Sequence, residues 1–208
     1  PTKNKINNIA RQATKGLAKN ISRQMSTFVR SYFAGVPVYD LVDRSTQNLA
    51  CSARSHFELA RSWTRGHRII RVFNPDKEEH GWESKHTIIQ IVTANTPFLV
   101  DSVMMELHRL GYAINLTIHP LLEIQRDRQK KINNVIPFSS EVDSFMFESF
   151  IYMEVDKEHN KDKLKNLASC LDRILEDTRL AVSDRKPMTD RLAEVIETLE
   201  SFPPPIKK

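Results

Sequence analysis

The sequence predicts an α+β fold: a four-stranded antiparallel sheet with helices on one face, preceded by N-terminal helices and followed by a C-terminal helix. Three observations support this prediction. Short runs rich in β-branched residues, such as His86–Thr93 (HTIIQIVT), alternate with polar loops. Residues 161–182 repeat apolar side chains at helical spacing. The segment Asn95–Tyr112 (NTPFLVDSVMMELHRLGY) combines a helix-start signal with a glycine stop.

The composition is that of a globular protein. The chain has 208 residues, of which 40% are hydrophobic and 27% charged, enough for one core with extensions. It contains no run of about 18 apolar residues that could span a membrane. Cys51 and Cys170 fit no metal or redox spacing and indicate free thiols in a reducing compartment. Because no secretory signal is recognisable either, we expect a cytoplasmic protein. The start at Pro1 rather than Met suggests a piece of a longer chain.

The N-terminal segment carries the positive charge. Residues 1–39 contain seven Lys and Arg and no acid, whereas the remaining 24 Lys and Arg face all 26 Asp and Glu. Residues 4–30 also repeat apolar side chains at helical spacing, with basic residues on the other face. A membrane-surface helix, a nucleic-acid arm and a transit peptide all fit this pattern. We favour a helix packed on the rest of the protein, because charge patterns alone are weak evidence. A second helical stretch covers residues 38–63.

The order of elements predicts the topology. In a ferredoxin-like unit the order is β-α-β-β-α-β, with the last strand beside the first. Here the order is β-β-α-β-β-α, so the leading strand takes the place of the missing last one.

We also expect Pro187 to separate the last two helices, and three domains: a helical segment (1–64), the sheet unit (65–186) and a C-terminal helix with a Pro-rich tail (187–208). The predicted strands are His67–Phe73, His86–Thr93, Ala113–Gln125 and Ser144–Asp156; residues 76–81 and 126–143 are predicted loops; the predicted helices of the sheet unit and beyond are 98–110, 161–182 and 189–201.

The helix at residues 98–110 carries the candidate site. We expect Asn95 or Thr96 to cap it, with Pro97 at its first position. Two apolar side chains, Phe98 and Met105, fall on its outer, polar face. They contact either the N-terminal helices of the same chain or a subunit or domain interface.

Two polar residues in the first turn of this helix could serve a ligand. A carboxylate such as Asp101 is favoured there by the helix dipole, and that explanation suffices for it. Ser102 lacks the surroundings of a nucleophile, which would need G-x-S-x-G. A helix start can bind the carboxylate of an amino acid, but Asp101 places negative charge in the same turn.

No other pattern indicates catalysis. The isolated glycines form no phosphate-binding loop, and no catalytic, cofactor-binding or metal-binding residue is predicted. His119 either forms a small polar site with Glu148 or Tyr152 or is a satisfied strand histidine. The histidines, which show no metal-ligand spacing, are His56, His67, His80, His86, His108, His119 and His159.

The sequence resembles the N-terminal region of the large bacterial NAD-specific glutamate dehydrogenases. The resemblance is carried by residues 86–102 (HTIIQIVTANTPFLVDS), His119-Pro120 with Arg126-Asp127, Asn74–Thr87 (NPDKEEHGWESKHT), Glu148–Asp156 (ESFIYMEVD) and Leu175–Met188 (LEDTRLAVSDRKPM). It covers roughly residues 30–202. It implies an ACT-like module in a parent enzyme that oxidises L-glutamate with NAD and water to 2-oxoglutarate and ammonia. The catalytic and NAD-binding parts would lie downstream, so no cofactor is expected in this chain.

The resemblance also implies partners and a ligand site. ACT modules often bind amino acids between the first strand and the first helix, which here are Asn95, Thr96, Pro97, Asp101 and Ser102. Phe98 stands where the family pattern has glycine, and Ala94-Asn95 where it is acidic; both departures favour a structural or interface role. We therefore expect a non-catalytic regulatory or assembly region. Its expected partners are downstream domains of the same polypeptide and further copies, with an amino-acid effector as the alternative; membrane and nucleic acid are not expected.

Overall fold

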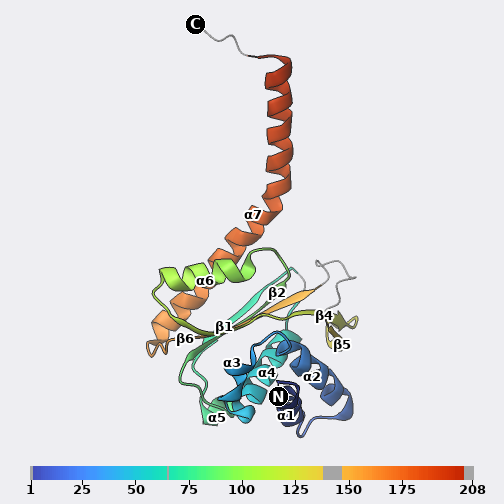
Figure 1. Cartoon of the computed structure of the whole chain (residues 1–208), viewed down its shortest axis with the longest axis vertical. Helices are drawn as coiled ribbons and strands as arrows, with labels where there is room; N and C mark the ends of the chain where they lie inside the picture. Colours follow the sequence, from blue (N-terminus) through green and yellow to red (C-terminus); the bar gives the residue numbers. More distant parts are fainter. Residues whose placement is uncertain (1, 65, 138–146, 204–208) are drawn as a thin grey trace.

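An antiparallel sheet lies between two layers of helices in the computed structural model, which describes residues 2–64, 66–137 and 147–203 (Figure 1). The strands follow the order β1-β2-β6-β4-β5, and β3 also pairs with β6. β2 and β6 pair along their whole length, from Thr87 opposite Val155 to Ala94 opposite Glu148. The strands are β1 (Ile69–Phe73), β2 (Thr87–Ala94), β3 (Ile114–Ile118), β4 (Leu121–Arg126), β5 (Ile132–Pro137) and β6 (Glu148–Val155).

The antiparallel sheet with its helices confirms the predicted α+β class. The helices cover both faces of the sheet, because the N-terminal helices lie on the face opposite to α6 and α7. Figure 1 shows α1 to α4 below the sheet, and α6 with the first half of α7 above it. The helices are α1 (Thr2–Ala13), α2 (Lys19–Tyr32), α3 (Val38–Val42), α4 (Thr46–Arg61), α5 (Lys77–His80), α6 (Leu99–Arg109) and α7 (Lys161–Ser201).

The sheet contains more strands than the four predicted. The predicted strand 113–125 is divided at His119-Pro120 into β3 and β4, because proline cannot donate a ladder hydrogen bond. β5 lies within the predicted loop 126–143, of which residues 138–143 are outside the described part. A turn at Asp127 joins β4 to β5: its carboxylate accepts from the backbone N–H groups of Gln129 and Lys131. Residues 144–146 of the predicted last strand also lie outside the described residues.

The basic N-terminal segment is two helices rather than one. The chain breaks at Gly16, which adopts a left-handed φ of 75° that glycine reaches without strain. The apolar faces of α1 and α2 are buried, with Ile9 and Phe28 at 0% exposure. The ring of Phe28 lies 5.1 Å from that of Phe57 in α4 and 5.2 Å from that of Phe150 in β6. The helical spacing is therefore explained by packing within this chain, as favoured above.

Strand β6 separates two apolar cores, because its side chains alternate between the faces. Phe150 and Tyr152 belong to the core shared with α1, α2 and α4. Ile151, Met153 and Val155 belong to the core beneath α6 and α7. All eight residues of β6 are buried, as expected of a strand covered on both faces.

The prediction of two separate C-terminal helices is wrong. Residues 161–201 form one helix, α7, with Pro187 inside it. Proline removes one hydrogen bond and costs roughly 3 kcal/mol in a helix interior, so the sequence alone favoured a break. The helix continues past Pro187, and the ion pairs Lys186–Asp190 and Arg191–Glu194 join side chains four and three residues apart along it. Within the described residues, no helix combines the length and apolar character that crossing a membrane requires. The division into three domains stays a prediction.

A buried histidine joins the N-terminal helices to the sheet. Nε2 of His56 lies 3.1 Å from the carbonyl oxygen of Ile91 and must donate to it, so Nδ1 accepts from the hydroxyl of Tyr32 at 2.8 Å. Burial lowers the pKa of His56 from 6.5 to about 3. The folded protein therefore keeps this ring neutral where the unfolded chain protonates it.

We predict that the free energy of unfolding falls as the pH is lowered from 7.5 to 5.5. The unfolded state binds a proton at His56 below pH 6.5 and the folded state does not, so stability is lost on acidification by about 1.4 kcal/mol over this range. Urea unfolding at both pH values measures the loss. His56→Gln is less stable at pH 7.5 but shows a smaller pH dependence. His119→Gln is the comparison variant: the pKa of His119 is also lowered, but less than that of His56, so this variant keeps more of the pH dependence of stability. An unchanged slope in His56→Gln contradicts the assignment.

Candidate functional site

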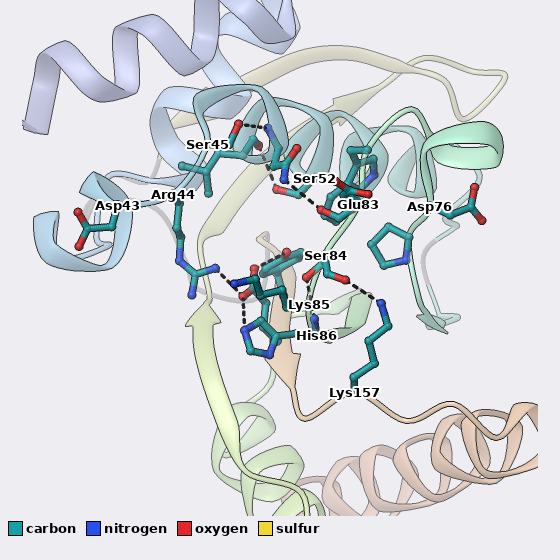
Figure 2. Close-up of a pocket in the computed structure, with 16 residues that line it drawn as sticks. Asp43, Arg44, Ser45, Ser52, Asp76, Glu83, Ser84, Lys85, His86 and Lys157 are labelled. Atoms are coloured by element: carbon teal, nitrogen blue, oxygen red, sulfur yellow. Dashed lines mark hydrogen bonds and ion pairs between the residues drawn. The ribbon is translucent and has the colours of Figure 1, made fainter.

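A cleft of about 670 Å³ opens where the N-terminal helices meet the sheet. Figure 2 shows its walls: the start of α4, the connection between β1 and β2, and Lys157 beyond the end of β6. Its charged lining mixes both signs, with Arg44, Lys85 and Lys157 against Asp43, Asp76, Glu83 and Glu154. A cleft with this lining does not select a ligand by charge alone.

The central carboxylate of the cleft, Glu154, is already bound within the protein. Arg44 forms an ion pair with it, and the hydroxyl of Tyr152 donates to Oε1 at 2.9 Å. Nε2 of His86 lies 4.0 Å from Oε2. Burial, followed by the charge of Glu154, raises the pKa of Tyr152 well above its usual value, so its hydroxyl stays a donor. This network binds the segment before α4 to the sheet.

The connection between β1 and β2 is held over the cleft by polar contacts. The side-chain amide of Asn48, in α4, donates to the carbonyl of Glu83 at 3.0 Å, and Nζ of Lys157 donates to that of Ser84 at 2.8 Å (Figure 2). Both contacts are sequence-distant and neither was predicted. The signal that could have found the cleft is Glu154 itself, since a carboxylate in an apolar strand requires a buried partner.

A second buried carboxylate of β6 shows the same arrangement. Glu148 receives two hydrogen bonds from Arg126 in β4, at 2.9 and 2.8 Å. Arg126 also donates to the carbonyl of Ala60 at the end of α4, and its guanidinium lies 5.2 Å from the ring centre of Trp63. This arginine therefore links β4, β6 and the C-terminal end of α4.

The structure of residues 95–98, the predicted ligand loop, differs from the prediction. The N–H of Asn95 donates to the carbonyl of Phe147 at 3.0 Å, which continues the pairing of β2 with the chain before β6. Helix α6 starts at Leu99, so the prediction of a cap at Asn95 or Thr96 with Pro97 in the first position is wrong. Its N-cap is Phe98, with no side-chain cap hydrogen bond.

Phe98 adopts a left-handed backbone conformation that usually requires glycine. Its φ of 67° and ψ of 9° lie in the left-handed region, which costs a residue with a Cβ roughly 1–2 kcal/mol. The ring is 60% exposed, and Met105, two turns later, is 62% exposed. The outer-face assignment of both residues is confirmed. The alternative of contact with the N-terminal helices is wrong, because those helices lie on the other face of the sheet.

His119 lies between β3 and β4, close enough to Asp101 in the first turn of α6 for that carboxylate to affect its pKa. Nε2 of His119 is 2.7 Å from the hydroxyl of Ser149, a buried residue on the face of β6 that α6 and α7 cover. Of the two alternatives for His119, the polar site with Glu148 or Tyr152 is wrong, because those side chains occupy the other face of β6. The hydrogen bond to Ser149 makes His119 a satisfied histidine. Desolvation lowers the pKa of His119 while Asp101 acts in the opposite direction. Asp101 is exposed and Ser102 half-buried; neither is brought to a nucleophile.

We predict that Arg44→Met destabilises the protein by about 2–3 kcal/mol, because it leaves the buried carboxylate of Glu154 without its cation. The double variant Arg44→Met/Glu154→Gln recovers part of the loss. Lys77→Met is the control, since its pair with Glu83 has side chains 72% and 61% exposed and contributes at most about 0.5 kcal/mol. Urea unfolding measures all three. Equal losses in Arg44→Met and Lys77→Met would show that the cleft pair is unimportant.

We predict that Phe98→Gly is more stable than Phe98→Ala by about 1 kcal/mol. Both variants remove the exposed ring, but alanine retains the left-handed strain and glycine does not. Thermal and urea unfolding of the two variants measure the free-energy cost of the left-handed backbone at position 98. An alanine variant as stable as the glycine variant means that this turn relaxes to another conformation.

Comparison with known proteins identifies the family. The family model described as "Glutamate dehydrogenase, ACT1 domain" matches residues 28–171. The NAD-specific glutamate dehydrogenase of Halomonas elongata is 34% identical over 188 residues, which cover 90% of this chain and 12% of that protein. The enzyme of the same name from Pseudomonas aeruginosa is 31% identical over 85% of this chain and 11% of its own length.

A more distant relative has the same name. The NAD-specific glutamate dehydrogenase of Mycobacterium tuberculosis is 22% identical over 71% of this chain and 9% of that protein. The chain thus spans about a tenth of the length of these relatives. It belongs to the glutamate dehydrogenase ACT1-domain family and corresponds to an N-terminal region of the NAD-specific glutamate dehydrogenases.

Proposed function

We propose that this chain is a non-catalytic assembly and regulatory region of a cytoplasmic NAD-dependent glutamate dehydrogenase. In the parent enzyme, L-glutamate, NAD and water would yield 2-oxoglutarate, ammonia and NADH. The family assignment and the small share of the relatives that the chain covers support this proposal. The NAD-binding and catalytic groups would belong to the remainder of the polypeptide.

The observation that carries the assembly role is the exposed ring of Phe98. An aromatic side chain that is 60% exposed, on a backbone that costs energy, gains nothing for the fold of this chain. Met105 extends the apolar surface along α6. Such apolar pairs on an otherwise polar helix face are typical of interfaces.

Helix α6, which carries Phe98 and Met105, packs against α7. Glu106 of α6 lies 3.9 Å from Arg173 of α7, and Leu110, just past the end of α6, lines one hollow together with Asn166 and Leu167 of α7. As residue numbers rise in α6 they fall in α7, so the two helices run antiparallel. The start of α6, with Phe98, therefore faces the part of α7 that leaves the sheet.

We predict that Phe98→Asp weakens assembly of the full-length enzyme while the 208-residue chain stays folded. A charge at the centre of an apolar contact must be desolvated on association, whereas on this exposed position it costs the fold little. Sedimentation velocity and glutamate-dependent NAD reduction of the full-length enzyme measure assembly, and circular dichroism of the short chain measures folding. Tyr39→Asp is the matched control, because Tyr39 is 72% exposed on α3, on the other side of the sheet.

The possible outcomes separate the hypotheses. Unchanged assembly in both Phe98→Asp and Met105→Asp would rule out this surface as an interface. Unfolding of the short chain by Phe98→Asp would assign the ring to the core. A rise of several degrees in the melting temperature of the wild-type chain with one amino acid would favour ligand sensing at Asn95–Ser102 instead.

A further inference from the structure

The second half of α7 stands clear of the rest of the protein (Figure 1). Every residue from Ser183 to Phe202 is exposed. At 1.5 Å per residue, this part of the helix is about 30 Å long. It therefore reaches well beyond the sheet and both helical layers.

This projecting segment has one apolar face. Its large apolar side chains recur at alternating steps of four and three residues, and at 100° per residue they cover a stripe about 120° wide. A stripe of this width is typical of a helix that faces a core. Asp190, Glu194 and Glu197 lie on the opposite face. The stripe residues are Met188, Leu192, Val195, Ile196, Leu199 and Phe202, which are 40–80% exposed.

The helix needs this stripe to be covered. Most of the stability of a protein helix comes from packing of an amphipathic face rather than from helix propensity, and Pro187 adds a cost of roughly 3 kcal/mol to this helix. Ion pairs such as Lys186–Asp190 and Arg191–Glu194 return only about 0.5 kcal/mol each. Burial of the apolar side chains is the largest further stabilisation that this segment can gain.

The pattern fits a larger apolar surface better than a second copy of the helix. The seam covers about two heptads, whereas a coiled coil typically sustains three to four. Ile196 lies beside the seam, which widens the face to the three positions in seven of a bundle helix. Arg191 on one flank would meet Ile196 of a parallel copy, so no ion pair forms across such a dimer.

We propose that residues 183–202 dock through this stripe into an apolar groove on another domain of the same dehydrogenase polypeptide. This inference rests on the proposed function, in which the chain is a region of a longer enzyme. Helix α7 is then shared between two domains: its first half completes the core beneath α6, and its second half completes the core of the next. Attachment through one chain raises the effective concentration of the two surfaces to roughly millimolar.

Hydrogen exchange tests the proposal in the full-length enzyme and in the 208-residue chain. We expect the amides of residues 183–202 to exchange roughly a hundredfold more slowly in the full-length enzyme. Leu199→Asp and Leu192→Asp remove this protection. Ser201→Asp, which adds the same charge on the opposite face within the same turn as Leu199, retains it.

Two results would overturn the proposal. Equally fast exchange of residues 183–202 in both proteins would mean that no domain covers the stripe. Concentration-dependent dimerisation of the 208-residue chain that Leu199→Asp abolishes and Ser201→Asp leaves intact would identify a second copy as the occupant. Failure of the proposed function is recognised separately: wild-type full-length protein would then show no glutamate-dependent NAD reduction, whatever its exchange pattern.

Discussion

The burial of β6 on both faces is the constraint on which the rest of the structure depends. Every residue of this strand is buried, and the strand pairs with β2 on one side and with β3 and β4 on the other. A strand of this kind requires an apolar layer on each face of the sheet. The helices α6 and α7 cover one face, so the N-terminal helices are a structural requirement and not an appendage of the sheet.

The two carboxylates of β6 determine how the N-terminal layer is positioned. Glu148 and Glu154 lie at opposite ends of the face that also carries Phe150 and Tyr152, and each is bound by an arginine from another segment. A buried carboxylate without a cation would cost several kcal/mol. Arg126 therefore holds the β4–β5 hairpin and the end of α4 at one end of β6, and Arg44 holds the segment before α4 at the other.

Local sequence patterns were sufficient for the fold class, for most elements and for the exposure of Phe98. They failed where a tertiary partner decided the outcome. Arg44 and Glu154 are separated by 110 positions, so no local pattern could join them into one cleft. The sequence of β5 was predicted to be a loop because its two asparagines and the neighbouring lysines are uncommon in strands, although this short segment pairs with β4. At Pro187 the predicted break between two helices was wrong, because the sequence pattern does not show that the helix is held at its other end by the core beneath α6.

The contact between the N-terminal helices and β6 also has a consequence for synthesis of the protein. The rings of Phe28 and Phe57 pack against each other, and Phe28 packs against Phe150, which is translated roughly 90 residues after Phe57. At about 5–20 residues per second, the ribosome needs roughly 5–20 s to supply that partner. During this time the apolar faces of α1, α2 and α4 have no sheet to cover them. The nascent N-terminal segment therefore exposes apolar surface for several seconds, the condition under which folding intermediates are prone to aggregate.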